Sequence, residues 1–376
     1  MKQFHYIIAG AGAAGLTLAY LLMEYEDREK SILIIDKDSK STNDRTWSFW
    51  EKGSNLLEHL VYKSWSKATV NTNSWSQTYE LAPYTYKMIR GIDFYEFMKQ
   101  ELNTSNLYWV QDEVLEITDA GQVTTTNDAY QGKLVFDSTF DPKLLQTSNA
   151  NTILQHFKGK VIRTEEDCFQ IDTATYMDFS VDQEGDCRFG YVLPFKPNEA
   201  LVEYTLFNKH LLSDSEYEHR LDAYIKQLRI KNYEVIEEEY GIIPMTDHKF
   251  LLRKSDKVFN IGIKGGFAKA STGYSFLRAQ QILERVVKNL ISGKKPDHEL
   301  PHQSLKYKLY DATLLKILAD KKYTGREVFG NLFQKNGIQS MFRFLDEETT
   351  LTEELKIMSS TPIIDFGKAF FHQLGK

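Results

Sequence analysis

The sequence predicts an α/β protein in which a Rossmann-like dinucleotide-binding domain is joined to a β-rich domain and a helical C-terminal region. Three observations support this prediction. The chain opens with the pattern of a buried strand, a glycine turn and a helix; residues from about 152 to 250 read mostly as strands; and residues 303–376 read as helices. A chain of 376 residues can bury a large core, and we expect two domains.

The opening residues have the layout of a dinucleotide-binding βαβ unit. The apolar run Tyr6–Ala9 lacks alternation, as expected for a parallel strand buried on both faces. A glycine turn follows, and the helix that begins near Ala13 directs free N–H groups and its dipole at phosphates. Asp36 ends a second apolar strand, 21 residues after Gly15, near the usual spacing of a ribose-binding acid. The predicted dinucleotide contacts are Gly10, Gly12, Ala14, Gly15 and Asp36.

Each glycine of this turn has a separate expected purpose. Gly10 permits the sharp turn, Gly12 lets the backbone approach a pyrophosphate, and Gly15 lets the helix pack closely on the strand. One alternative is a glycine turn that binds nothing. Another is a membrane span, because Tyr6–Met23 holds no charged side chain. The turn spacing of the glycines and the strand that ends at Asp36 argue for a soluble unit instead.

Composition narrows the class of protein. Hydrophobic residues make up 42% and charged residues 26%, which is typical of a globular chain, and a net charge of −6 offers no basic surface for nucleic acid. Cys168 and Cys187 lack metal-binding spacing, so we expect no metal site and two reduced, buried thiols in a cytosolic protein. The 23 Phe and 21 Tyr suit either a long apolar ligand or an aromatic core.

The rest of the chain suggests a discontinuous nucleotide-binding domain. A second glycine loop at residues 264–275 follows a buried strand at residues 258–262 and opens a helix at residues 276–291. Earlier segments predict a helix at 93–102, a strand pair at 107–117 and 121–126, and a buried strand at 133–137. An amphipathic helix at 215–228 lies among the strands of the β-rich region. We expect a nucleotide-binding domain at 1–60, 95–150 and 255–300, a substrate domain at 61–94 and 151–254, and a C-terminal helical region at 301–376.

Seven segments outside the first unit follow one another in a specific order. They are residues 44–50 (DRTWSFW), 86–95 (YKMIRGIDFY), 177–179 (MDF) with Gln183, 191–195 (YVLPF), 201–206 (LVEYTL), 241–245 (GIIPM) and 262–276 (GIKGGFAKASTGYSF). With these segments the chain resembles the bacterial lycopene beta-cyclase family of the flavoprotein type, from about residue 4 to 370. The resemblance implies a glutathione-reductase or hydroxylase-like fold that holds non-covalent FAD, reduced by NAD(P)H. It also implies that lycopene, a hydrocarbon drawn from the membrane, is cyclised at its ψ ends to the β-rings of beta-carotene without net redox change.

Such a cyclisation needs an acid whose pKa is raised by apolar surroundings. Glu203 is the candidate, because it matches the family motif Phe-x-Glu-Glu/Asp-Thr within an apolar strand. The strand alone also fits a solvent-facing glutamate. Tyr204 replaces the second acid of the motif, which puts a carboxylate pair at this spot in doubt. Asp178 is a second candidate carboxylate. The similar-looking residues 344–349 (FLDEET) read instead as an exposed turn before a helix.

Further residues are predicted around the flavin and the hydrocarbon. Gly265, Gly266, Thr272 and Gly273 are expected at the flavin pyrophosphate and isoalloxazine edge, although no Gly-Asp pair supplies the ribityl-binding aspartate of flavin hydroxylases. Arg45 and Arg90 are candidates for flavin phosphates or for a carboxylate, with surface ion pairs as the alternative. Aromatic side chains that line a hydrocarbon tunnel or pack in the core are Trp47, Phe49, Tyr191 and Phe195.

Two other functions remain open at this point. One is an FAD-dependent monooxygenase or oxidoreductase acting on an apolar substrate, and the other is a non-catalytic flavin or prenyl-lipid carrier. For the cyclase we expect a cytoplasmic protein peripherally associated with a membrane surface. Residues 310–318 and 329–344 mix apolar with basic side chains, as an interfacial helix does, and packing on a domain is the alternative. The sequence leaves the oligomeric state open.

Overall fold

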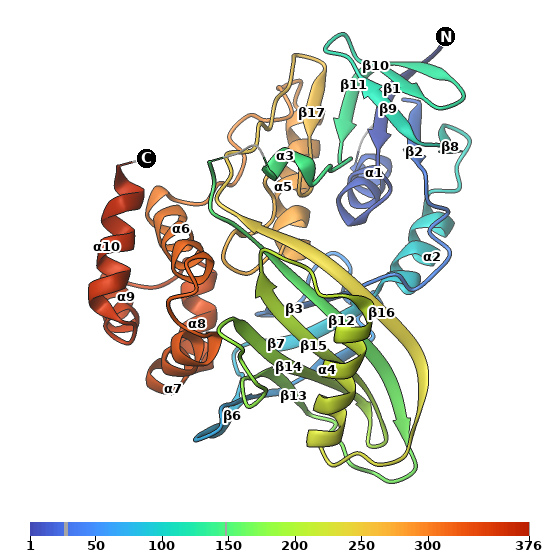
Figure 1. Ribbon diagram of the computed structural model, residues 1–376. Coiled ribbons are helices and arrows are strands. Elements are labelled where there is room, and N and C mark those ends of the chain that lie inside the picture. The colour runs from blue at the N-terminus through green and yellow to red at the C-terminus, as the bar shows by residue number, and fades with distance from the viewer. Residues whose placement is uncertain (26–28, 147–148, 376) are drawn as a thin grey trace. The chain divides into compact units, whose positions relative to one another are not determined.

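The computed structural model describes residues 1–25, 29–146 and 149–375, while residues 26–28, 147–148 and 376 lie outside the described part (Figure 1). The chain forms two compact units, each assembled from three segments. The first unit comprises Met1–Asn43, Arg90–Ser148 and His248–Gln303, and the second comprises Asp44–Ile89, Asn149–Asp247 and Ser304–Lys376. The C-terminal helices therefore share a unit with the β-rich region, as do residues 44–60.

The first unit is built on a mainly parallel sheet. Its strands are β1 (Lys2–Ala9), β2 (Ile32–Asp36), β8 (Leu107–Gln111), β9 (Val114–Ile117), β10 (Gln122–Thr125), β11 (Ala129–Asp137) and β17 (Val258–Asn260). The order is β8-β2-β1-β11-β10-β9, and β17 also pairs with β11. The strands β8, β2, β1, β11 and β17 pair in parallel, whereas β10 pairs antiparallel with both β11 and β9.

The segment 107–117, predicted as one strand of a pair, is two strands with different partners. β8 extends the parallel sheet beside β2, and only β9 forms the expected pair with β10. The division falls at Asp112, whose carboxylate accepts the backbone N–H groups of Glu113 at 2.8 Å and Asn127 at 3.1 Å. A side chain that binds nearby backbone in this way competes with strand pairing and ends β8.

Helices accompany the parallel strands of the first unit. They are α1 (Ala13–Tyr25), α2 (Gly91–Glu101), α3 (Lys143–Gln146) and α5 (Phe276–Ile291), and α1 packs against α5. Ile7, Ile8, Leu33 and Ile34 have no exposed surface, so β1 and β2 are buried on both faces. The sequence predictions of β1, α1, β2 and α5 are confirmed.

The second unit contains a larger, mostly antiparallel sheet. Its strands are β5 (Lys67–Asn71), β6 (Ser76–Glu80), β12 (Thr152–Thr164), β13 (Thr173–Asp178), β14 (Cys187–Lys196), β15 (Glu199–Asn208) and β16 (Tyr233–Thr246), in the order β16-β12-β15-β14-β13-β5-β6. Only the pair β13 and β5 is parallel. A small second sheet has the order β3-β7-β4, with β3 (Thr46–Glu51), β7 (Thr85–Arg90) and β4 (Lys63–Trp65).

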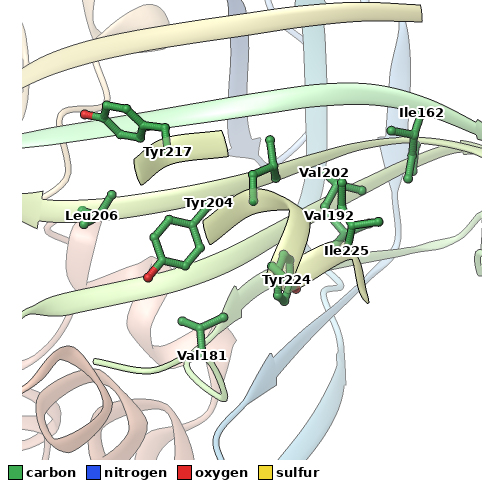
Figure 2. Packing of buried hydrophobic residues seen from close by; sticks show 11 residues of the cluster. Ile162, Val181, Val192, Val202, Tyr204, Leu206, Tyr217, Tyr224 and Ile225 are labelled. Carbon is green, nitrogen blue, oxygen red and sulfur yellow. The ribbon is translucent and has the colours of Figure 1, made fainter. Parts of the chain in front are cut away.

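The helix α4 (Asp214–Gln227) covers one face of the larger sheet. It begins with a capping box in which the backbone N–H of Ser213 donates to the Glu216 carboxylate at 2.8 Å. Figure 2 shows side chains of β14 and β15 packed against Tyr217, Tyr224 and Ile225 of this helix. The remaining helical segments of the unit are η1 (Glu58–Leu60), α6 (Leu305–Ala319), η2 (Arg326–Gly330), α7 (Asn331–Asn336), α8 (Ile338–Leu345), α9 (Leu351–Ser359) and α10 (Ile363–Leu374).

Three further observations bear on the sequence predictions. Cys187 is buried, but Cys168 is exposed, because it follows the charged residues 165–167 in the loop after β12; the prediction of two buried thiols is wrong for Cys168. Within the described ranges, no helix combines the length and apolar character that a membrane crossing requires. In the same ranges, no cluster of three or more His, Cys, Asp or Glu side chains could hold a metal ion.

Candidate functional site

The glycine turn of the first unit has a backbone that needs glycine at two positions. Gly10 has φ +98°, a left-handed conformation, and a Cβ there would lie 2.3 Å from Ser138 Oγ. A Cβ on Gly15 would lie 2.0 Å from the Gly10 carbonyl oxygen, so the helix can approach the turn only without a side chain. A Cβ on Gly12 would meet nothing within 4 Å. The turn therefore leaves open space at Gly12, as a bound phosphate requires.

Asp36 ties the second strand to this turn. Its Oδ2 accepts the backbone N–H of Ala11 at 2.6 Å, and its Oδ1 accepts that of Asp38 at 2.8 Å. Lys40 Nζ lies 3.7 Å from Asp36 Oδ1. The carboxylate thus stands at the carboxyl end of β2, next to the turn, where a ribose-binding acid belongs.

The parallel strands end together at one edge, since Ala9 pairs with Asp137 and Asp137 pairs with Asn260. Sequence reasoning missed the polar groups gathered there. Asp137 is buried and accepts from Lys264 Nζ at 2.5 Å. Asn260 Oδ1 is buried and has no hydrogen-bond partner among the residues that the structure describes. These groups could have been found from the sequence, because Asp137 and Asn260 are each the polar last residue of a buried strand.

The second glycine loop meets the first at this edge. A Cβ on Gly262 would lie 3.2 Å from the Ala14 Cβ at the start of α1. Gly266 and Gly273 have φ +75° and +71°, and a Cβ on Gly265 would lie 2.5 Å from the Asn260 carbonyl oxygen. Thr272 Oγ1 accepts the backbone N–H of Tyr274 at 3.2 Å. Two glycine loops, the N-terminus of α1 and an unpaired buried acceptor thus converge where a dinucleotide binds in this kind of sheet.

The two arginines predicted near the flavin lie in different segments. Arg45 belongs to the second unit, and its Nη2 lies 3.0 Å from Asp44 Oδ2. Arg90 caps the start of α2 and makes a two-pronged contact with Asp93, at 2.7 Å from Nε and 2.6 Å from Nη2. Their predicted roles remain predictions.

Glu203 lies on the side of the larger sheet that faces away from α4. Alternate residues of a strand point to opposite faces, and Val202, Tyr204 and Leu206 point into the cluster around α4 (Figure 2). Glu203 therefore points to the other face, and only 7% of its surface is exposed. The alternative of a solvent-facing glutamate is wrong.

A second carboxylate lies beside Glu203, and it comes from another strand. In register, Gly159 of β12 pairs with Glu203 on one side and with Glu239 of β16 on the other. A Cβ on Gly159 would lie 2.8 Å from Glu203 Cγ and 3.1 Å from Glu239 Cγ, so both side chains lean over the glycine. Burial, and then the negative charge of Glu239 and a hydrogen bond to it, raise the pKa of Glu203 well above its usual range.

Asp178 does not join this pair. It pairs in register with Gly190, and a Cβ on Gly190 would lie 2.0 Å from the Tyr224 ring of α4. Asp178 therefore lies on the α4 face, where Tyr224 donates to its Oδ2 at 3.2 Å and the Ser180 backbone donates to its Oδ1 at 2.9 Å. Its placement gives no support to the predicted catalytic role, because the sheet separates it from Glu203.

Aromatic side chains extend from Glu203 across the same face. Tyr191 pairs with Glu203 in register, and its hydroxyl lies 2.7 Å from that of Tyr86. Tyr86 packs edge-on against Tyr176 at 5.5 Å, and Tyr176 packs edge-on against Phe342 at 5.6 Å. Ring faces attract positive charge, so this row suits a site where a cation develops. Of the other predicted lining residues, Phe49 is buried, whereas Trp47 and Phe195 are half-buried.

The acidic residues at 346–348 form a turn in the C-terminal helices. Asp346 accepts from the Trp50 indole at 2.8 Å, and Glu348 forms an ion pair with Lys52. Thr350 and Glu353 then form a capping box that starts α9. The interpretation of this segment as a turn before a helix is confirmed.

The architecture defines a class of protein first. A geranylgeranyl bacteriochlorophyll reductase-like protein from Thermoplasma acidophilum superposes with a TM-score of 0.67 at 13% identity, over 98% of each chain. A flavin-dependent brominase gives 0.59 at 12% identity, over 97% of this chain and 94% of the other. The fold is therefore the Rossmann-like fold of flavin-dependent monooxygenases and reductases, as predicted.

Sequence comparison then gives the family. The chain belongs to the lycopene cyclase protein family, whose model matches residues 6–369. Lycopene beta-cyclase of Pantoea ananas is 23% identical over 383 residues, 96% of each chain. Chloroplastic neoxanthin synthase of Solanum tuberosum is 26% identical over 312 residues, 77% of this chain, and the match spans 61% of that protein's length. The resemblance to bacterial lycopene beta-cyclases is confirmed.

Proposed function

We propose that this chain is a lycopene beta-cyclase, which converts the ψ end groups of lycopene to the β-rings of beta-carotene. Membership of the lycopene cyclase family supports the substrate. The observation that supports the chemistry is Glu203, a buried carboxyl group beside an aromatic face, whose burial raises its pKa and so favours the protonated form that an acid needs.

In the proposed reaction Glu203 acts as the acid. Its O–H bond breaks as the proton adds to the terminal double bond of the ψ end, which leaves a tertiary carbocation. The neighbouring double bond attacks this cation and closes a six-membered ring. A base then removes one ring proton to form the β double bond. One proton enters and one leaves, so no electrons are gained or lost. The aromatic row next to Tyr191 stabilises the cation through its ring faces.

We propose FAD as the bound cofactor, with NAD(P)H as its reductant. The turn from Gly10 to Gly15, with its open space at Gly12, fits the pyrophosphate, and Asp36 fits a ribose. Asn260 Oδ1 adds, at the same edge, a buried acceptor that no described residue satisfies. The second loop, with Gly265, Gly266, Thr272 and Gly273, fits the flavin end, and Arg45 and Arg90 are proposed to assist. Reduced FAD supplies negative charge that stabilises a carbocation electrostatically.

The test is anaerobic incubation with lycopene, FAD and NADPH, followed by product analysis. The wild type is expected to form beta-carotene, and Glu203→Gln is expected to keep FAD but lose turnover. Glu238→Gln is the matched control, because it removes the same charge from an exposed position whose side chain contacts Lys158 instead. Normal cyclisation by Glu203→Gln would show that Glu203 is not the acid. Product formation that requires oxygen and consumes NADPH would indicate a monooxygenase, and binding without turnover would indicate a carrier.

We propose that the protein is cytoplasmic and meets the membrane through α10. The segments 310–318 and 329–344, expected at the interface, instead bury their apolar side chains, including Leu315, Phe333 and Phe342. On α10, Ile364 and Phe371 are 73% and 72% exposed and lie seven residues apart, on one helix face. The exposed Lys368 lies between them, and the substrate must be drawn from lipid.

A double variant tests this surface while keeping the helices that pack in the second unit. Ile364→Asp with Phe371→Asp is expected to lose co-sedimentation with liposomes of anionic and neutral lipids. A matched control places the same two charges at exposed, neutral polar positions, Gln77→Asp and Asn103→Asp. Co-sedimentation equal to that of the wild type would rule out this face.

A further inference from the structure

The pair of carboxyl groups over Gly159 raises a question of hydrogen bonding that the proposed function leaves unanswered. A carboxylate only accepts hydrogen bonds, so two carboxyl groups can bond to each other only when one of them holds a proton. The Glu203 and Glu239 side chains lean over Gly159 from the two strands that flank it, so their carboxyl groups can meet. Glu239 Oε1 is buried and has no donor among the described residues. A proton on the neighbouring carboxyl group would satisfy it.

We propose that Glu203 and Glu239 share one proton across Gly159, and that Glu239 is the positioning residue that keeps this proton on Glu203. This proposal rests on the proposed cyclase function for its chemical purpose. It assigns the second acid of the site to a residue 36 positions further along the chain than Glu203, on the edge strand β16.

The surroundings of the two groups determine which of them is ionised. The Thr46 hydroxyl at the start of β3 donates to Glu239 Oε2 at 2.6 Å, so this oxygen already has a donor and the proton is needed only between the two carboxyl groups. Glu203 lies deeper, between β12 and β14, and burial disfavours its charged form. The negative charge therefore resides on Glu239 and the proton on Glu203.

The other ionisable groups near Glu203 do not replace Glu239 in this role. From β14 the neighbour in register is Tyr191, and from β12 it is Gly159, which has no side chain. Glu237 lies two residues before Glu239 on β16 and is exposed. On β15 itself, Glu199 lies four residues before Glu203 and forms ion pairs with Arg163 and Lys196.

With one shared proton, the pair can donate the first proton to the substrate and later accept the proton that leaves the ring. When the O–H bond of Glu203 breaks and a C–H bond forms on the substrate, the two adjacent carboxylates both carry charge. Their repulsion favours recovery of one proton, and the ring proton that must leave in the last step supplies it. Atoms and charge balance over the cycle, since the pair ends with the single proton with which it began.

The test measures protonation directly and needs no substrate. Protein labelled with ¹³C-glutamate is titrated while the infrared C=O band of protonated carboxyl groups is followed. Wild type is expected to keep one such band at neutral pH. Glu239→Gln removes the repelling charge, so the midpoint should fall by at least about one pH unit, about a tenfold change in the proton equilibrium. Thr46→Val removes the donor to Glu239, so the proton should be redistributed between the two groups and the C=O band should shift in frequency. Glu238→Gln should leave it unchanged.

The pH profile of cyclisation provides the second measurement. Glu239→Gln should lose activity about tenfold for each pH unit above the lowered midpoint and recover it at lower pH, which a purely structural role would not produce. The proposal is overturned if the wild type shows no C=O band of a protonated carboxyl group, or if the titration of that band is unchanged in Glu239→Gln or the band itself is unchanged in Thr46→Val. If Glu239→Gln does not fold, Thr46→Val alone decides between these outcomes. The expected titrations without any cyclised product would refute the proposed function and leave the shared proton intact.

Discussion

Replacing Gly159 by alanine tests the geometry on which the acid site depends. The new Cβ would lie 2.8 Å from Glu203 Cγ, 3.1 Å from Glu239 Cγ and 3.1 Å from Leu201 Cδ1. Carbon atoms in contact prefer about 3.5–4.0 Å, so the methyl group would displace the Glu203 methylene by about half an ångström or more. Because the methyl group stands between the two glutamates, it would push them apart.

Two magnitudes follow from this displacement. Overpacking of a filled site costs about 1–3 kcal/mol in the free energy of unfolding. Two unit charges about 4 Å apart interact with about 4 kcal/mol at an effective dielectric constant of about 20, and each further ångström removes about 0.8 kcal/mol. A separation of one ångström therefore lowers the pKa of Glu203 by about half a unit, because one unit corresponds to about 1.4 kcal/mol.

The assay combines urea unfolding with the infrared titration of labelled protein. Gly159→Ala is expected to unfold at lower urea and to lose its proton at lower pH than wild type. Gly367→Ala on α10 is the control, since its Cβ would meet nothing within 4 Å, and alanine favours a helix over glycine by about 1 kcal/mol. If Gly159→Ala matched wild type in both measurements, the two glutamates would not meet over Gly159 and the reasoning would fail.

Three further predictions concern other parts of the molecule. In Gly15→Ala the Cβ would lie 2.0 Å from the Gly10 carbonyl oxygen, so the protein should bind less FAD than the wild type; equal FAD binding would contradict the proposed dinucleotide site at this turn. In Gly190→Ala the Cβ would lie 2.0 Å from Tyr224 Cζ, so α4 should be displaced at a cost of at least about 1–3 kcal/mol, seen as faster amide hydrogen exchange in residues 214–227, and unchanged exchange would count against this packing. Burial lowers the pKa of His156 to about 4. The unfolded chain therefore takes up this proton first, and stability should fall by up to about 3 kcal/mol as the pH drops from about 6.5 to 4. His156→Gln should lack that part of the pH dependence in urea titrations, and an unchanged dependence would exclude His156 as its source.

Local patterns were sufficient for the opening βαβ unit and for α5, because their signals are short in sequence. The glycine spacing, the apolar strand before it and Asp36 all lie within the first 36 residues, and they predicted β1, α1 and β2. The helix predicted at residues 276–291 has the same bounds as α5, whose apolar residues recur at helical spacing. Each of these features depends on neighbours along the chain.

Predictions failed where the outcome depends on strand register or on packing between distant segments. Asp178 was a second candidate carboxylate, and its register with Gly190 places it on the opposite face of the sheet from Glu203, which the sequence alone does not reveal. Glu239 stood among the charged residues 237–239 of β16, with nothing local to separate one from another. Only the pairing of β12 with both β15 and β16 brings it next to Glu203.

The same alternation explains why Tyr204 does not weaken the case for an acid at Glu203. A residue directly after Glu203 must point to the opposite face of the sheet, and here Tyr204 packs among the side chains around α4. A carboxylate at position 204 could therefore not share a proton with Glu203 in this fold. A partner for Glu203 has to come from a neighbouring strand at the same register position, and a glycine between them lets the two side chains touch. Gly159 of β12 and Glu239 of β16 meet that requirement. The doubt about a carboxylate pair therefore concerned position 204, which faces the other side of the sheet.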